Sequence, residues 1–261
     1  RNKTDNYEMF VDSEQAELVS SAPIVSQEQF QKITESLKTK NNPALLPIQI
    51  AYYTGLRIGE VCALTWQDID LKEQYLTVRR SVSYNNTRHK TEIGPTKRKK
   101  IRTVDFCDTL AEILKKAKIE QQHNRKQYGE LHSKNYYIEV VEKSRSYFEL
   151  YSLGQPDVVP EGYKELSLVC TKPDGSYESV RAVTSITKST AKKVAGIEDF
   201  HFHLFRHTYT SNLLSRGATP KDVQELLGHS DVSTTMNIYA HATRDSKKAS
   251  ARMLDQSTVS A

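Results

Sequence analysis

Histidines gather toward the end of the chain. Five of the eight lie between residues 201 and 241. A histidine is seldom needed merely to fill a helix, so this clustering indicates work on protons, on a metal ion or on phosphate. Four short segments, of which two contain these histidines, could carry such chemistry. The five histidines are His201, His203, His207, His229 and His241.

The first segment, Thr54 to Glu60, places an arginine just after a turn and at the start of a helix. There Arg57 could aim a fixed fork of N–H donors at an oxyanion such as phosphate. Glu60 follows one helical turn later and could hold the orientation of Arg57. The alternative is an ordinary surface ion pair between residues three apart, which contributes only a few tenths of a kcal/mol.

The second segment is the basic run from Thr96 to Arg102. Lys97, on a turn between two expected strands, could protonate a leaving oxygen. The alternative is a solvated basic turn that touches the DNA backbone. Cations that could make such DNA contacts are Arg88, Lys90, Arg98, Lys99, Lys100 and Arg102.

The third segment contains His203 and Arg206, which are three residues apart and therefore share one face of a helix. Leu204, Phe205 and Tyr209 could bury the opposite face. A core histidine whose ring nitrogen has a hydrogen-bond partner is the alternative interpretation of His203.

The fourth segment contains Gly228, His229 and, ten residues later, Tyr239. Gly228 is typical of the residue after a helix end, which places His229 on a turn. Tyr239 would end the next helix, and a tyrosine alone at such a place would normally be packing.

Together these residues suit phosphoryl transfer. Preorganised cationic donors stabilise the extra negative charge of a pentacoordinate phosphate. A histidine could accept the proton of Tyr239, because the pKa of an unperturbed tyrosine is about 10. The chain has neither a GxxxxGK[ST] nor an HExxH motif, and it has no Ser/His/Asp nucleophile elbow.

The elements that must position these side chains are mostly helical. A capping box at Ser26 and Gln29 starts a helix, and further helices are expected at about 44–53, 58–64, 108–127, 179–195, 203–215, 220–227, 233–239 and 245–254. Strands are expected near 75–78, 82–84, 90–93 and 101–104. The fold class is therefore α+β and mostly α-helical, with a small antiparallel sheet.

Residues 130–165 differ in character. They are aromatic and β-prone, with seven acidic and four basic residues, whereas 88–102 holds seven basic residues and one acid. We interpret 130–165 as an inserted set of strands.

Composition bounds the remaining possibilities. With 261 residues, a net charge of +5 and a mean hydropathy of −0.62, the chain suits one large or two small domains and not a membrane protein. Three scattered cysteines, without a CxxC pair, indicate neither a disulfide framework nor a zinc knuckle, and favour a reduced cytoplasmic setting. No signal peptide opens the chain.

Four segments, in this order and spacing, resemble the catalytic domain of the tyrosine recombinases, the family of phage and transposon integrases. The resemblance covers roughly residues 26–254. It rests on the segments TGLRIGEVCALTWQDID, TKRKKIRTV, HFHLFRHTYTSNLL and LLGHSDVSTTMNIYAH.

The resemblance implies a role for each matched residue. The catalytic set falls on Arg57, Lys97, His203, Arg206, His229 and Tyr239, with Glu60 in support. Tyr239 would attack a DNA phosphodiester, form a 3′-phosphotyrosine and free a 5′-hydroxyl, without ATP, metal or other cofactor. Double-stranded DNA and further copies of the chain, from dimer to tetramer, are the implied partners in a bacterial or phage-derived cytoplasmic setting. The helix at 245–254 could dock on a neighbouring copy or cap its own chain.

The resemblance also implies a domain organisation. We expect an arm at 1–24, the catalytic domain at 25–254 with its insertion at about 130–165, and a tail at 255–261. Members of this family normally carry a further DNA-binding domain ahead of the catalytic one, and the first residue here is not Met. The chain is therefore expected to be a piece of a longer protein. The insertion resembles those of integrases from conjugative transposons and could contact DNA or a neighbouring copy.

Three other functions remain open from the sequence. A type IB topoisomerase would share the chemistry and relax supercoils as a monomer, although the TGLRxGE and LGH segments favour the recombinase. A DNA-binding module without catalysis would use only the basic run. A metal site on His201, His203 and His229 lacks carboxylates at ligand spacing.

Overall fold

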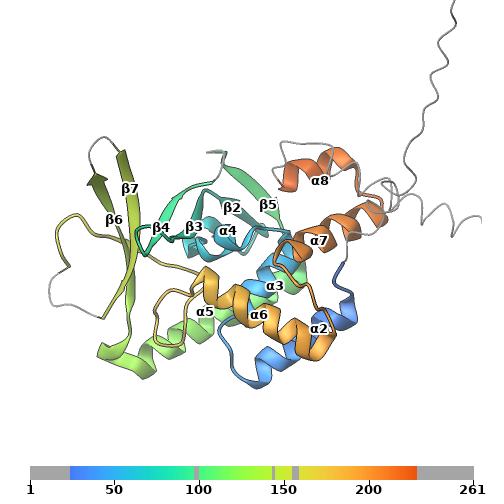
Figure 1. Cartoon of the computed structure of the whole chain (residues 1–261), viewed down its shortest axis with the longest axis horizontal. Coiled ribbons are helices and arrows are strands. Elements are labelled where there is room, and N and C mark those ends of the chain that lie inside the picture. Colours follow the sequence, from blue (N-terminus) through green and yellow to red (C-terminus); the bar gives the residue numbers. More distant parts are fainter. Residues whose placement is uncertain (1–23, 97–99, 143–144, 155–158, 228–261) are drawn as a thin grey trace, which may run out of the picture.

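The computed structural model describes residues 24–96, 100–142, 145–154 and 159–227 (Figure 1). Its helices are α2 (Gln27–Thr39), α3 (Leu45–Thr54), α4 (Ile58–Cys62), α5 (Asp108–Tyr128), α6 (Val180–Ala195), α7 (His203–Ser215) and α8 (Pro220–Leu227). Its strands are β1 (Ile69–Asp70), β2 (Tyr75–Val78), β3 (Arg80–Asn85), β4 (Lys90–Pro95), β5 (Arg102–Asp105), β6 (Lys134–Glu142), β7 (Arg145–Leu153) and β8 (Lys164–Leu166). Two short 3-10 turns lie at Trp66–Asp68 and Gly129–Leu131.

Local sequence signals account for most of the helices. The Ser26 side chain accepts from the Gln29 backbone N–H at 3.1 Å, and the Gln29 side chain accepts from the Ser26 N–H, so the expected capping box is confirmed. The expected bounds of α7 are confirmed at both ends, and α8 begins at Pro220 as expected and continues to Leu227, the last described residue. Helix α4 is shorter than expected and ends at Cys62. The expected helices at 233–239 and 245–254 lie outside the described residues.

Helix α5 begins at Asp108, the first residue of the expected range, and Cys107 is its N-cap residue. The Asp108 carboxylate accepts from the side chain of Gln74 at 2.8 Å. None of the described helices is both long and apolar enough to cross a membrane.

The described strands form two antiparallel sheets, where the sequence indicated one small sheet and a separate insertion. The first sheet has the order β1-β2-β5, and the second has the order β3-β4-β7-β6-β8. The inserted strands continue the β3–β4 hairpin, because β7 pairs with β4 at Glu92↔Glu149 and Ile93↔Phe148. The expectation that 130–165 adds strands is therefore confirmed, and the ribbon of β6 and β7 extends to one end of the molecule (Figure 1).

The two strands that flank the basic run belong to different sheets and do not form a single hairpin. Strand β4 ends at Pro95, which has no N–H to continue the ladder. Strand β5 then pairs with β2, with Arg102 opposite Val78. Because β4 and β5 belong to different sheets, the segment between them crosses from one sheet to the other.

The main hydrophobic core lies where α2, α3, α5, α6 and α7 meet the first sheet. Its fully buried members include Ile33, Ile48, Leu76, Leu110 and Phe205. A second, smaller cluster joins α4 to the second sheet and contains Cys62, Ala63, Val82, Ile93, Leu150 and Leu168. The overall class, mixed α/β with small antiparallel sheets, agrees with the expectation.

Candidate active site

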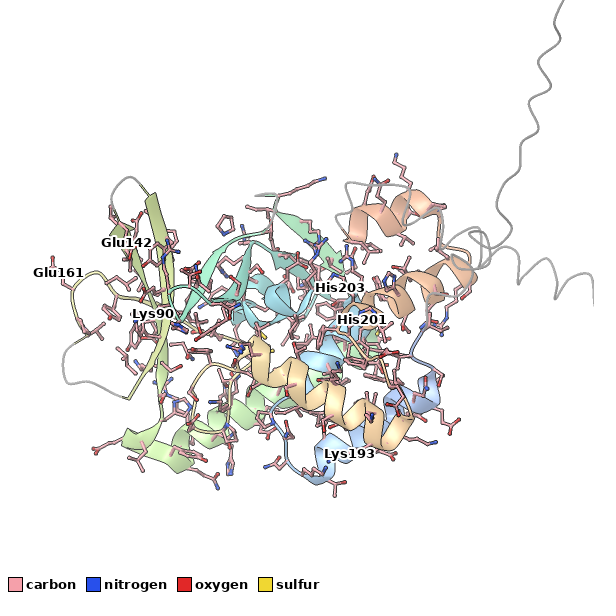
Figure 2. All side chains as sticks on the ribbon, viewed as in Figure 1. Lys90, Glu142, Glu161, Lys193, His201 and His203 are labelled. Atoms are coloured by element: carbon pink, nitrogen blue, oxygen red, sulfur yellow. The ribbon has the colours of Figure 1, made fainter. Side chains whose placement is uncertain are left out.

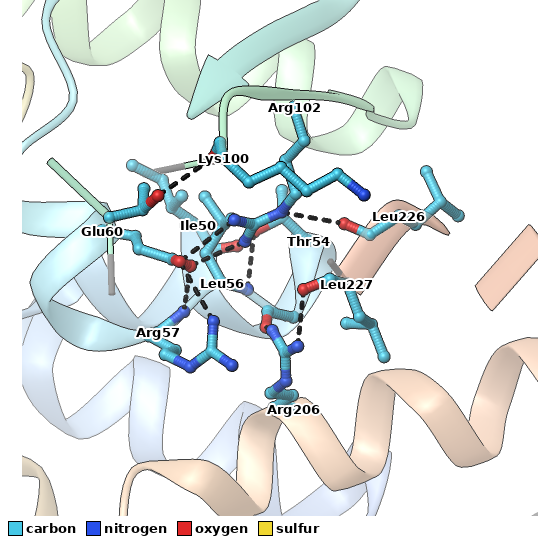
Figure 3. Close-up of polar contacts among 12 residues, drawn as sticks. Ile50, Thr54, Leu56, Arg57, Glu60, Lys100, Arg102, Arg206, Leu226 and Leu227 are labelled. Carbon is cyan, nitrogen blue, oxygen red and sulfur yellow. Dashed lines mark hydrogen bonds and ion pairs between the residues drawn. The ribbon is translucent and has the colours of Figure 1, made fainter. Parts of the chain in front are cut away.

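A buried carboxylate lies at the centre of the candidate site. The side chain of Glu60 is 3% exposed, and it accepts hydrogen bonds from two arginines (Figure 3). Arg57 donates from its backbone N–H to Oε2 and from Nη1 to Oε1, both at 3.1 Å. Arg102 donates from Nη1 to Oε1 at 3.1 Å and from Nη2 to Oε2 at 2.7 Å. Glu60 is therefore no partner in an ordinary surface ion pair, which was the alternative for this motif.

The turn between α3 and α4 places Arg57. Helix α3 ends at Gly55, whose φ of +66° is a left-handed conformation that glycine adopts at little cost. Arg57 then takes an extended conformation as the N-cap of α4, three residues before Glu60. About a third of its side chain, 35%, remains exposed, so Arg57 can reach a ligand at the surface.

Arg206, the other arginine of the predicted catalytic set, is held against the same turn. It lies on α7, is 5% exposed, and donates from Nη1 to the Gly55 carbonyl at 2.9 Å. Its Nη2 donates to the Leu227 carbonyl at the end of α8, at 2.6 Å. Burial and, after it, the nearby Arg57 lower the pKa of Arg206 to about 9, which still leaves the guanidinium charged at neutral pH.

His203 lies one turn before Arg206 on α7. The surrounding protein, followed by the charges of Arg206 and Arg57, lowers the pKa of His203 below its ordinary value of 6.5. The imidazole is therefore neutral at pH 7 beside two cations. Leu204 and Phe205 are buried as predicted, whereas the side chain of His203 reaches the surface, unlike the core histidine of the alternative interpretation.

Several predicted residues lie outside the part of the chain that the structure describes: Lys97, Arg98, Lys99, His229 and Tyr239. Their neighbours do adjoin the site. The Thr96 hydroxyl donates to the Lys100 carbonyl at 2.9 Å across the basic run, and Leu227, which Arg206 contacts, directly precedes Gly228 and His229. The roles of these residues stay predictions.

Arg102 occupies a place that the sequence analysis did not anticipate. We expected it at the DNA surface, but its side chain is 8% exposed and its fork faces Glu60. Its Nε also donates to the Leu226 carbonyl at 3.3 Å. Strand alternation could have revealed this, because Arg102 and the buried Val104 face the same side of β5.

Arg88 and Lys90, also expected to contact DNA, bind residues of the inserted strands. Arg88 lies 3.4 Å from a Glu142 carboxylate oxygen and 4.1 Å from the centre of the Tyr147 ring. Lys90 lies 3.6 Å from the carboxylate of Glu149. Figure 2 shows Lys90 of β4 and Glu142 of β6 toward the same end of the molecule, away from His203. These two cations therefore help to hold the ribbon on β3 and β4.

Of the three histidines that the sequence analysis considered as metal ligands, His201 and His203 lie among the described residues. Among the described residues, no group of three or more His, Cys, Asp or Glu side chains could hold a metal ion. The third of those histidines, His229, lies outside them. The described part of the site draws its positive charge from guanidinium groups, which suit a phosphate oxyanion.

The arrangement can stabilise negative charge and can transfer a proton. Two guanidinium groups bind the Glu60 carboxylate, and the charge of Arg206 lies close enough to interact with both Glu60 and Arg57, which leaves an excess of positive charge where Arg57 reaches the surface. Such fixed donors stabilise a phosphate as its negative charge grows. The neutral imidazole beside them can accept or donate a proton.

Comparison with known proteins agrees with this description. The profile of the phage integrase family matches residues 24–245. A tyrosine recombinase XerC-like protein of Caldanaerobacter subterraneus is 33% identical over 224 residues, which cover 83% of this chain and 49% of that protein. The prophage integrase IntR of Escherichia coli is 27% identical over 82% of this chain and 46% of its own length. The chain thus spans about half the length of these curated relatives.

Solved structures share the fold. The Tn1549 transposon integrase, in complex with transposon right end DNA, superposes with a TM-score of 0.61 at 20% identity, over 90% of this chain and 67% of that one. The XerA recombinase superposes with a TM-score of 0.56 at 16% identity, over 88% and 66%. These likenesses confirm the expected fold class.

Proposed function

The chain belongs to the phage integrase family of tyrosine recombinases, and on that premise we propose that it cuts and rejoins DNA at specific sites to integrate and excise a mobile element. One observation carries the proposal. Arg57 and Arg206 converge on the turn at Gly55, with neutral His203 beside them. This is a site for a phosphodiester that gains negative charge during reaction.

In the proposed reaction, the phenolic oxygen of Tyr239 attacks the phosphorus of the scissile phosphodiester. The phosphorus–5′-oxygen bond breaks, and a 3′-phosphotyrosine and a 5′-hydroxyl result. His203 accepts the tyrosine proton, and Lys97 protonates the departing 5′-oxygen. A 5′-hydroxyl of another strand then attacks the phosphotyrosine, so the energy of the ester bond is conserved and no nucleotide cofactor is consumed. His229 completes the donor set around the phosphate.

The partners follow from the same reaction. Double-stranded DNA is the substrate, and a structure of the Tn1549 transposon integrase with transposon end DNA supports such binding for this fold. Exchange between two duplexes needs several copies of the chain, which we propose to be a dimer that pairs into a tetramer, with the segment 245–254 docked on the neighbouring copy. The protein would act in the bacterial cytoplasm on DNA.

The test is covalent capture of DNA by the full chain. A pool of nicked duplexes with a randomised stretch around the nick traps the intermediate, because the cleaved short strand diffuses away. We expect a protein–DNA adduct that Tyr239→Phe abolishes. Tyr128→Phe, at an exposed tyrosine of α5, is the matched control and should leave the adduct intact.

Loss of the arginines should slow the same step. Arg57→Ala or Arg206→Ala should reduce the rate of adduct formation by about 10²–10³-fold, as for loss of one transition-state donor. An adduct that survives Tyr239→Phe would show that the nucleophile is another residue. A chain that relaxes supercoils but exchanges no strands between two sites would be a topoisomerase and not a recombinase.

A further inference from the structure

Arg102 is fixed on two sides by groups from distant parts of the chain. Its two terminal nitrogens bind both carboxylate oxygens of Glu60, at 3.1 and 2.7 Å. On the other side its Nε donates to the Leu226 carbonyl of α8 at 3.3 Å. With 8% of its side chain exposed, this guanidinium has a bidentate geometry that a flexible surface arginine would not keep (Figure 3).

We propose that Arg102 is a positioning residue for DNA cleavage, which acts through Glu60 to hold Arg57 toward the scissile phosphate. This inference rests on the function proposed above. Arg102 does not touch DNA in this proposal. Its effect on the reaction passes through the carboxylate that it shares with Arg57.

Competition for Glu60 is the physical reason. While Arg102 occupies both oxygens, Arg57 binds Glu60 through only one guanidinium nitrogen, Nη1, and its backbone N–H. Without Arg102, Oε2 of the buried carboxylate would lose one of its two hydrogen-bond donors and keep only the backbone N–H of Arg57. The Arg57 guanidinium could then rotate and bind both carboxylate oxygens. That movement would turn donors of Arg57 away from the phosphate.

A second arginine provides a matched control. Arg80, on β3, also binds a buried carboxylate, that of Asp68, and donates to the Thr65 hydroxyl at 3.1 Å. Its partners lie around the turn at Trp66–Asp68 and not at the Gly55 turn. A loss of cleavage that came only from breaking a buried ion pair would therefore appear equally in Arg80→Lys and Arg102→Lys.

The experiment is a double-mutant cycle on the rate of adduct formation at saturating nicked DNA. Arg102→Lys keeps the positive charge but cannot bind both oxygens of Glu60 as a fork. We expect the rate to fall about tenfold, by analogy with the roughly 10–100-fold loss on removing a residue that orients a metal ligand. Arg80→Lys should leave the rate unchanged, and neither variant should alter DNA affinity.

The decisive comparison is made in the Arg57→Ala background. If Arg102 acts through Arg57, Arg102→Lys should reduce the rate of adduct formation by less than about twofold there, because the side chain that Arg102 positions is already absent. A tenfold loss in both backgrounds, or an equal loss in Arg80→Lys, would overturn the proposal. Arg102→Met repeats the cycle with a larger change, and thermal unfolding of each variant shows whether it is folded.

The outcomes separate this inference from the function on which it rests. If the parent chain forms an adduct through Tyr239 but the two losses are independent, the role of Arg102 is wrong and the function stands. If the parent chain forms no adduct that depends on Tyr239, the function is wrong and the role of Arg102 falls with it.

Discussion

At the scale of single residues, the site depends on how one carboxylate divides its hydrogen bonds. Glu60 is buried and accepts from Arg57 and Arg102, and these bonds together with the two cations hold its pKa below the ordinary value despite burial. It therefore remains ionised at neutral pH and orients both arginines. A neutral glutamine at this position could not hold two guanidinium groups in the same way.

His203 gives a prediction about pH. Partial burial of the ring, then the charges of Arg206 and Arg57, keep the pKa of His203 below 6.5, so it resists protonation and stays a proton acceptor as the pH falls to that value. We expect the rate of adduct formation at limiting DNA to stay constant from about pH 8 to about pH 6.5 as far as this group is concerned, and to fall only at lower pH.

The control for this prediction lies one turn further along α7. The pKa of His207 is also lowered, first by burial, but we assign it no part in the reaction. His207→Asn should retain the profile, whereas His203→Asn should slow cleavage and remove the acid limb. An acid limb that lies above pH 6.5, or one that persists in His203→Asn, would contradict the role of His203.

At the scale of elements, the turn from α3 to α4 decides where Arg57 and Arg206, the two arginines that we propose as catalytic, lie. Gly55 has a positive φ, and a Cβ there would lie 2.6 Å from the Tyr209 ring and 2.8 Å from Leu227. The Gly55 carbonyl also accepts from Arg206. The same glycine thus provides the chain reversal, the close packing of α7 and α8, and an anchor for Arg206.

Gly55→Ala should therefore damage both stability and activity. The left-handed conformation alone costs about 1–2 kcal/mol in alanine, and the clash with Tyr209 adds to it. Urea unfolding should show a loss of at least that size, with slower adduct formation on the protein that remains folded. Gly94→Ala is the control, because a Cβ at Gly94 would meet nothing within 4 Å. Equal losses in the two variants would contradict this account.

The sequence predicted elements better than it predicted their pairing. Helix α7 and the start of α8 were predicted where they are observed, because apolar periodicity and end signals are local. The pairing of β4 with β7 joins residues such as Ile93 and Phe148, and no local signal fixes such a partner. Spacing predicted the contact of Arg57 with Glu60 and placed His203 and Arg206 on one helix, but the bonds of Arg102 to Glu60 and Leu226 depend on tertiary packing.

At the scale of the whole molecule, the ribbon of β6 and β7 and the arginine site lie at different ends. The ribbon joins β4 through two residue pairs and exposes Val141, whose side chain is 71% accessible. Helices α7 and α8 lie toward the opposite end (Figure 1). We therefore propose that the ribbon contacts a neighbouring copy or flanking DNA, apart from the proposed site of cleavage.

Removing the ribbon should separate assembly from cleavage. A chain in which a short Gly-Ser linker replaces residues 133–162 should still form the adduct on one duplex, but should fail to assemble copies on two. Loss of the buried Leu150 lowers stability, so Val141→Glu, a surface change, provides the second variant. Unchanged assembly and strand exchange in both variants, measured by gel shift and two-duplex recombination, would contradict a role for the ribbon.

The passage of the chain between the two sheets has a mechanical consequence. The segment that carries Lys97 starts from β4 in the second sheet and arrives at β5 in the first. Its described ends, Pro95 and Arg102, are therefore held by hydrogen-bond ladders in two different sheets, and the ribbon extends the sheet that holds Pro95. A displacement of that sheet relative to the first would change the spacing of these two anchor residues. A partner bound to the ribbon could in this way act on the segment of the residue that we propose as the proton donor.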